Sequence, residues 1–478
     1  MKVAMRTAIA ALMLASSVAS PSEAQESQST RDSAARMPSQ SLILVNSDSE
    51  DEFRTQQLYR GVAPGKSLLL RSATTLTPPL SLEKNFIDAA PIAPQLLIVR
   101  NSDLPFSQNN SAMWAGRGAS SRIVAGFKVA APHMSLVFAP QIIASDNQHW
   151  KIRGDYYQPP WPSGYEGKGY TLPYNLYTFP IDAPLRFGNE RVRDFDMGES
   201  TLSFNERGFE AGVSNENQWW GPGIRNAMIL SNNAPGFPHL FFRTQHPVNT
   251  LVGGIDFSWL VGELKESRYF DTVAVNNIRS LAAIGVTLQT RWDPNLSIGF
   301  SRSVYATAKD RNQIAGRFTD VFKDASAPDT AILTEIWRGN SLRGGRDQLT
   351  SLFARWVFPK NGAEVYGEWG RTRLPKGLAD FLKTPNHTQG YTVGMQWLGK
   401  SFGDGNVRLQ GEITQLEQSA TFRDGPVGSW YTSSRVIQGY TNEGQVIGAS
   451  IGPGASSQFV AADYMAPSRR AGIIAGRI

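Results

Sequence analysis

The sequence of 478 residues contains no cysteine. A chain without cysteine forms no disulfide bond, holds no thiolate-bound metal and has no cysteine nucleophile. It also lacks the residue to which bacteria attach the lipid anchor of a lipoprotein. Membrane attachment through such an anchor is therefore excluded.

Histidine is scarce as well. The five histidines are widely separated, and no two have the spacing of a metal site on a helix or a β-ribbon. An Asp-x-Asp pair, Asp194 and Asp196, lacks the further oxygen ligands that a calcium site requires. We predict neither a metal site nor a cofactor.

Motifs of common hydrolases are also missing, because no G-x-S-x-G element occurs. Glu364 and Glu368 would lie on one face of a strand, about 13 Å apart by the strand rise. That separation exceeds the distance between the carboxyl groups of inverting glycosidases. We predict no catalytic residue. A barrel hydrolase acting on lipid or glycan is a minor hypothesis, supported only by scattered carboxylates and hydroxyls.

Dense basic clusters, typical of a nucleic-acid groove, do not occur either. The formal net charge is +6, and the lysines and arginines are scattered along the chain. Such a surface tolerates acidic polysaccharide or lipopolysaccharide phosphate. We predict no nucleic-acid partner.

Long apolar runs are absent beyond the N-terminus, so we predict no transmembrane helix. Residues 1–6 are basic, residues 7–19 are apolar, and Ser22-Glu23-Ala24 fits a cleavage site after Ala24. The chain is predicted to leave the cytoplasm with its signal peptide removed. Any residence in a membrane must then be as a β-barrel.

The sequence predicts few helices. Residues 47–60 begin with Ser47 as N-cap and Glu50 at the capping-box position. A second possible helix covers residues 82–90, and shorter ones are expected at 314–322 and 374–384. Residues 25–40 read as a disordered leader. Residues 61–67, GVAPGKS, resemble a phosphate-binding loop but are one residue short and follow a helix, so we reject that interpretation.

The rest of the chain, from about Gly116, alternates between apolar and polar residues, as strands do. Each alternating segment is about as long as the ten residues of a tilted membrane-spanning strand. The clearest segments are residues 255–261, 284–291, 296–301, 364–369, 391–397 and 407–414.

Alternation alone fits a secreted β-sandwich, a propeller or a membrane barrel, but two observations favour the barrel. Full charges recur on the polar face, as in a hydrated lumen: Arg291, Glu364, Glu368, Arg408 and Glu412. Tryptophans lie near strand ends, as in the aromatic girdles of outer-membrane barrels: Trp259, Trp292, Trp356, Trp369, Trp397 and Trp430. No internal repeat supports a propeller.

One stretch, residues 215–240, stands apart, with the sequence NENQWWGPGIRNAMILSNNAPGFPHL. Trp219 and Trp220 precede a Gly-Pro-Gly turn, and Arg225, Asn232 and Asn233 follow it. Aromatic rings beside amides and a guanidinium suit sugar binding. The alternative is a structural block that packs the barrel wall or a loop facing the lumen, and the turn-forming residues favour this second interpretation.

The same stretch carries a family resemblance. QWWGPG followed by ILSNNAPGFPHL resembles the Wzi family of outer-membrane capsule assembly proteins, and LLLRSATTLTPP at residues 68–79 adds to the likeness. The resemblance implies an all-β fold, a transmembrane antiparallel barrel of about 18 strands with a small helical region at its periplasmic end. It also implies lectin-like retention of capsular polysaccharide or exopolysaccharide at the cell surface, without known catalysis.

Together these features predict a signal peptide at residues 1–24, a periplasmic helical region and linker at 25–110, and an outer-membrane barrel of a Gram-negative bacterium at 111–478. The expected partners are capsular polysaccharide or exopolysaccharide, outer-membrane lipid or lipopolysaccharide, and the polysaccharide export machinery. The main alternative function is a porin or solute-specific channel with a positive lumen. Barrels usually end on a strand with a terminal aromatic residue, whereas this sequence stops at AGIIAGRI. We therefore expect a different closure or a missing last segment.

Overall fold

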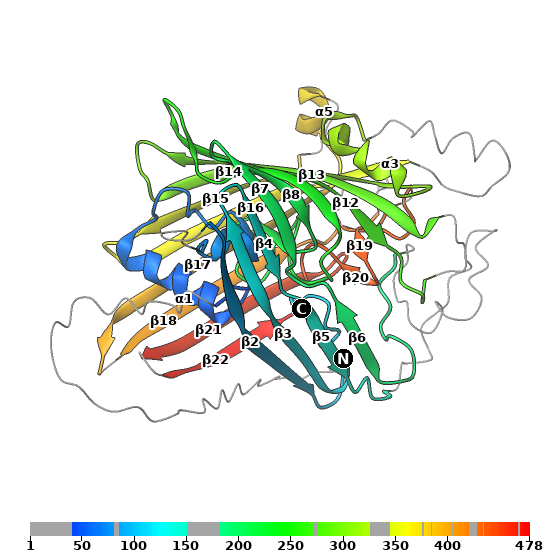
Figure 1. The fold of residues 1–478 in the computed structure, drawn as a ribbon, viewed down its shortest axis with the longest axis horizontal. Coiled ribbons are helices and arrows are strands. Elements are labelled where there is room, and N and C mark those ends of the chain that lie inside the picture. Colours follow the sequence, from blue (N-terminus) through cyan, green and yellow to red (C-terminus); the bar gives the residue numbers. More distant parts are fainter. Residues whose placement is uncertain are drawn as a thin grey trace.

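The computed structural model describes residues 41–80, 86–150, 181–270, 276–325, 345–374, 377–383, 385–403, 405–419, 428–433, 435–466 and 469–478. The predicted signal peptide and leader lie outside these ranges. Antiparallel strands form a closed barrel around the N-terminal helix (Figure 1). This confirms the predicted fold class.

Within the described ranges, the barrel contains 18 strands. In chain order they are β2 (Asp88–Asn101), β3 (Gly118–Ala131), β4 (Met134–Phe138), β5 (Gln141–Ser145), β6 (Val192–Asp196), β7 (Thr201–Glu206), β8 (Phe209–Ser214), β10 (His239–Thr244), β11 (Val248–Asn249), β12 (Gly253–Lys265), β13 (Ile278–Thr290), β14 (Leu296–Thr307), β15 (Arg346–Phe358), β16 (Ala363–Arg371), β17 (Gln389–Phe402), β18 (Gly405–Gln415), β21 (Ser456–Ala466) and β22 (Arg469–Arg477).

Some of these strands are parts of one interrupted strand. β4 and β5 both pair with β3, and β10 and β11 both pair with β12. β2 already belongs to the barrel, so barrel structure begins at Asp88, inside the stretch expected to be a helical region and linker. β22, which carries the AGIIAGRI sequence, pairs with β21 from Gln458 to Ala466.

The two ends of the barrel differ in their connections. At one end, here called the turn end, short turns join neighbouring strands at residues 132–133, 207–208, 250–252, 291–295 and 359–362. At the other, the loop end, the connections are long: residues 102–117, 146–191, 215–238, 266–277, 308–345, 372–388 and 416–455. Outer-membrane barrels place short turns in the periplasm and long loops outside the cell. We therefore orient the barrel with the turn end toward the periplasm and the loop end toward the outside of the cell.

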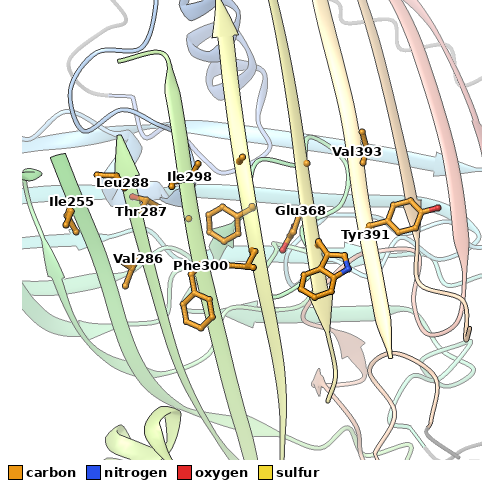
Figure 2. Close-up of a pocket in the computed structure, with 15 residues that line it drawn as sticks. Ile255, Val286, Thr287, Leu288, Ile298, Phe300, Glu368, Tyr391 and Val393 are labelled. Carbon is orange, nitrogen blue, oxygen red and sulfur yellow. The ribbon is translucent and has the colours of Figure 1, made fainter. Parts of the chain in front are cut away.

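The outward face of the wall is apolar, as the alternation predicted. Ile298, Val393 and Met395 are 43%, 55% and 55% exposed, whereas Ser297 and Thr392 face inward and are buried. A shallow outward depression of about 740 Å³ crosses β12 to β17. Figure 2 shows Phe300, Tyr391 and Val393 among its lining side chains. An apolar outer face of this kind suits contact with lipid hydrocarbon.

Two residues, Arg291 and Trp430, do not lie where the sequence predicts them. Arg291 follows the end of β13 and is exposed in a turn, so it is not part of the inward charge row. Trp430 was predicted as a girdle residue, but it is buried in the interior and donates from Nε1 to the carbonyl of Gln389. Trp292, Trp356 and Trp397 are exposed near the turn end, as a girdle requires.

The N-terminal helix is α1 (Asp48–Arg60), with Ser47 as the predicted N-cap accepting from the backbone N–H of Glu50. The predicted helix at residues 82–90 is wrong where the structure describes it, because β2 begins at Asp88. Pro91 and Pro94 lie in this strand, and Pro94 falls at its bulge.

The predicted helix at 314–322 is divided into α3 (Asn312–Ala315) and the 3₁₀ helix η2 (Phe318–Phe322). α5 (Leu378–Lys383) confirms the short helix expected within 374–384. None of the helices in the described ranges is long and apolar enough to cross a membrane.

Three segments fill the barrel interior. The first runs from residue 41 through α1, β1 (Leu70–Ser72) and α2 (Ala73–Leu76). The second is residues 215–238, with β9 (Gln218–Trp220), and the third is residues 428–455, with the hairpin β19 (Thr441–Asn442) and β20 (Gln445–Val446). The second and third segments share the largest hydrophobic cluster, which includes Trp220, Ile229, Tyr431 and Ile447. The expected hydrated lumen is therefore packed with protein along these segments.

Candidate functional site

The tryptophan block leaves the wall after β8 and returns to it at β10, so it enters the barrel from the loop end. Inside, β9 pairs with β1 of the N-terminal segment: Trp219 lies opposite Arg71 and Trp220 opposite Leu70. This short sheet joins two of the three interior segments.

Both tryptophan rings are enclosed. Trp219 is 1% exposed, donates from Nε1 to the carbonyl of Gly223 at 3.1 Å, and lies beneath the Arg71 guanidinium. Trp220 is 0% exposed and packs in the largest hydrophobic cluster. Neither ring offers a free face on which a sugar could stack.

The Gly-Pro-Gly turn requires its glycines. Gly221 has a φ of +114°, and a Cβ at this position would lie 2.7 Å from the Oε2 atom of Glu368. A Cβ at Gly223 would lie 1.9 Å from the carbonyl oxygen of Asn226. The turn can therefore approach the wall only because side chains are absent here.

Two wall carboxylates hold the chain that follows the turn. Glu412 of β18 accepts hydrogen bonds from the backbone N–H groups of Ile224, Arg225 and Asn226, at distances from 2.7 to 3.2 Å. Glu368 of β16 accepts from the N–H of Met228 at 3.2 Å. These loop N–H groups have no partner in a β-sheet, and the carboxylates supply their hydrogen-bond acceptors instead.

The remaining predicted site residues also make internal contacts. Asn232 donates to the carbonyl of Val45 at 3.0 Å, and Asn233 donates to the carbonyl of Val446 at 2.9 Å. These bonds tie the second interior segment to the first and to the third. The guanidinium of Arg225 lies 4.3 Å from the centre of the Phe459 ring.

Helix α1 is fixed to the wall by ion pairs. The carboxylate of Glu364 on β16 accepts hydrogen bonds from Arg54 of α1 at 2.7 Å and from Arg355 of β15 at 2.8 Å. Arg408 of β18 reaches Asp51 of α1 at 2.7 Å. All three arginines are nearly inaccessible, so their charges are compensated inside the protein.

Arg71 is the central cation of the interior segments. It pairs with Glu50 and donates to the carbonyls of Gly221 and Gly223 at 3.1 and 3.0 Å. Burial lowers the pKa of the Arg71 guanidinium, and the Glu50 carboxylate opposes this shift. Arg71 therefore holds together α1, β1 and the Gly-Pro-Gly turn.

The loop end carries an aromatic group that sequence reasoning missed, here called the loop-end cluster: Trp114, Phe187, Tyr269 and Arg268. The ring centres of Trp114 and Phe187 are 5.1 Å apart, and those of Phe187 and Tyr269 are 5.7 Å apart. The exposed Arg268 guanidinium lies 5.1 Å from the Tyr269 ring. All three rings are partly accessible. Their separation along the chain leaves no local motif that would reveal them.

Acidic side chains of the described residues are dispersed, and those on the inner face of β16 and β18 are engaged in bonds. No group of three or more metal-ligating side chains comes together there. The carboxylates of Glu364 and Glu412 are both engaged by arginines or backbone amides. These groups act as structural charges.

Comparison with known proteins gives a consistent result. The family model described as capsule assembly protein Wzi matches residues 130–470, which is more than half of the chain. No curated protein sequence matches the chain.

Among solved structures, Wzi of Escherichia coli is similar, with a TM-score of 0.54 and 12% identity over 91% of this chain and 85% of that one. It is described as an outer-membrane protein involved in group 1 capsule assembly and as a carbohydrate-binding β-barrel. A mutant porin of Rhodopseudomonas blastica also matches, with 8% identity over 75% of this chain and 89% of that one, but its TM-score of 0.29 supports no conclusion.

The family match covers most of the wall strands and the whole tryptophan block, and the closed barrel has an apolar outer face. The chain belongs to the Wzi family of capsule assembly proteins and is a β-barrel of the outer membrane.

Proposed function

We propose that this barrel attaches capsular polysaccharide or exopolysaccharide to the cell surface in a lectin-like, non-catalytic way. The observation that carries the proposal is the barrel interior, in which three segments pack against one another and bond to the wall. A barrel filled in this way is a rigid support for binding at its outer end. The carbohydrate binding of the E. coli relative supports the same function.

We place polymer contact at the loop-end cluster. A partly exposed aromatic row with an arginine beside it offers apolar faces for sugar rings and a cation for acidic groups. Trp219 and Trp220 then serve as structural residues beneath this surface. Their burial supports this assignment.

The alternative is a porin or solute-specific channel. It would need a continuous water-filled path, whereas Trp220, Tyr431 and their neighbours occupy the centre of the barrel. The attachment function is favoured for this reason. An enzyme has weaker support still, because the inward carboxylates of Glu364 and Glu412 are committed to structural bonds.

Other partners follow from the orientation of the barrel. The apolar outer face contacts lipid, and lipopolysaccharide surrounds the half nearer the loop end. The turn end faces the periplasm, where the export machinery would approach.

Deletion of the gene tests the proposal. Surface-bound polymer should fall and polymer in the medium should rise, with total synthesis unchanged. Unaltered surface-bound polymer in the deletion strain would refute attachment. Turnover of polysaccharides or esters by the purified protein would refute the non-catalytic part.

A further inference from the structure

A second polar site lies at the opposite end of the barrel from the loop-end cluster. It is a cavity of about 630 Å³ between residues 64–80 of the N-terminal segment and the wall strands β3, β4, β10 and β12. Exposed residues at its mouth, including Lys66 and His246, place it at the turn end, and buried residues such as Lys128 and Gln218 form its inner part. We call it the turn-end cavity.

Three of the charged side chains that line this cavity, Arg71, Glu210 and Arg243, are already compensated. Arg243 pairs with Glu210 at 2.7 Å and with Glu216 at 3.1 Å, and Arg71 pairs with Glu50. These pairs fix the shape of the site and leave no charge for a ligand.

Lys128 of β3 has no such partner. It is 5% exposed, yet its ammonium donates only to the carbonyl of Ser41 at 3.3 Å, and no carboxylate of the described residues lies within 4.0 Å. A buried ammonium without a counter-ion is costly, and a bound anion would remove that cost.

Lys66 gives the mouth of the cavity a second cation. Its ammonium donates to the carbonyl of Thr75 at 3.3 Å and, within the described ranges, likewise has no ion pair. The facing carboxylate, Asp256, accepts from the hydroxyl of Thr244. The cavity therefore has two ammonium groups without an ion pair, Lys66 and Lys128, and one facing carboxylate, Asp256. Its lining carries an excess of positive charge.

The other lining groups suit a sugar. Threonine, glutamine and asparagine side chains supply hydrogen-bonding groups, and the rings of Pro78 and Pro132 supply apolar surface. A volume of about 630 Å³ lies within the usual range for small-molecule sites and accommodates a short oligosaccharide.

We propose that the turn-end cavity binds a short segment of acidic saccharide from the periplasmic side, with the carboxylate of the sugar at Lys128. The barrel then holds the polymer at two places, one on each side of the membrane. The inference takes the kind of polymer from the proposed function but requires no part of the loop-end cluster.

Calorimetric titration of the purified barrel in detergent micelles tests the inference. Trigalacturonic acid is the probe, maltotriose is its neutral counterpart, and inorganic phosphate tests for an anion site without sugar selectivity. We expect binding of trigalacturonic acid, weaker binding of maltotriose, and no displacement by equimolar phosphate.

The decisive variant is Lys128→Met, which replaces an uncompensated buried charge and should therefore fold. Its Kd for trigalacturonic acid should rise at least tenfold, about 1.4 kcal/mol. Lys360→Met, at an exposed turn-end lysine outside the cavity, should leave the Kd unchanged. If Lys128→Met does not fold, Lys66→Met replaces it with the same expected direction.

Three results would overturn the inference: no binding of trigalacturonic acid, equal Kd values for the cavity variant and the wild type, or full displacement by phosphate. Tyr269→Ala separates this site from the proposed function. This variant should bind trigalacturonic acid with the wild-type Kd even if it retains less polymer on cells. Failure of polymer attachment can therefore be distinguished from failure of the cavity site.

Discussion

The carboxylate of Glu412 and the backbone amide of Asn226 lie 2.8 Å apart inside the barrel, although 186 residues separate them in the sequence. Glu412 is 3% exposed and gathers three consecutive N–H groups at the point where the chain leaves its Gly-Pro-Gly turn. A wall strand near the end of the chain thus shapes a segment from its middle.

Replacing Glu412 by alanine should lower the free energy of unfolding by about 3–5 kcal/mol, because three N–H groups, one of them fully buried, lose their acceptor. Urea unfolding in detergent micelles, followed by tryptophan fluorescence, measures the change. Glu417→Ala, at an exposed position beyond the same strand, is the matched control and should be nearly neutral. Equal effects of the two substitutions would contradict the role assigned to Glu412.

Glu364→Gln should be similarly destabilising. The substitution leaves the buried guanidinium groups of Arg54 and Arg355 without their shared carboxylate, at an expected loss of about 3–5 kcal/mol. A second substitution, Arg54→Met, should restore part of the loss by removing one unpaired charge. Urea unfolding, followed by tryptophan fluorescence, compares the single and double variants. If the double variant Arg54→Met, Glu364→Gln is less stable than Glu364→Gln alone, charge compensation is not the role of Glu364.

Trp220→Ala should cost about 3–5 kcal/mol, because it opens a void in the largest hydrophobic cluster. Trp292→Ala is the control, since that ring is 76% exposed at the turn end. A folded Trp220→Ala barrel that loses polymer binding without losing stability would instead make the ring part of a binding site.

Tyr269→Ala should weaken polymer attachment, because the residue links Phe187 to Arg268 in the loop-end cluster. Truncating an aromatic anchor at a binding surface typically costs about 2 kcal/mol, roughly a thirtyfold loss of affinity. Polymer retained on cells that express the variant gives the readout, with Trp292→Ala as control. Retention at the wild-type level would move the binding surface elsewhere.

The wild-type barrel should carry no stable current in a planar lipid bilayer, because the interior segments are bonded to the wall and to one another. A general porin measured in the same bilayer provides the positive control. Steady, voltage-independent conductance from the purified protein would favour the channel alternative.

The wall was predictable from the sequence because its signal is local. In residues 296–301 and 391–397, side-chain alternation follows directly from the geometry of a strand, and the structure places both segments in the barrel. Glu364, Glu368, Arg408 and Glu412 were assigned to the inward face by the same parity, and the structure confirms that face.

The interior was not predictable, because it depends on contacts between distant segments. Trp430 and Trp397 are both predicted as girdle residues, yet one is buried in the barrel and the other is exposed on its wall. Asp88 to Ala90 precede prolines that usually end helices, but pairing with β3 makes them a strand. The loop-end cluster likewise forms only when three separate loops meet.

The ion pairs of α1 also constrain the order in which the molecule is assembled. Asp51 precedes every barrel strand in the sequence, yet Arg408 of β18 and Arg470 of β22 both reach it at 2.7 Å. Because both of these arginines lie on strands near the end of the sequence, the two ion pairs form only after β18 and β22 have been made. The attachment of the first helix to the wall is therefore completed only with the last strands of the barrel.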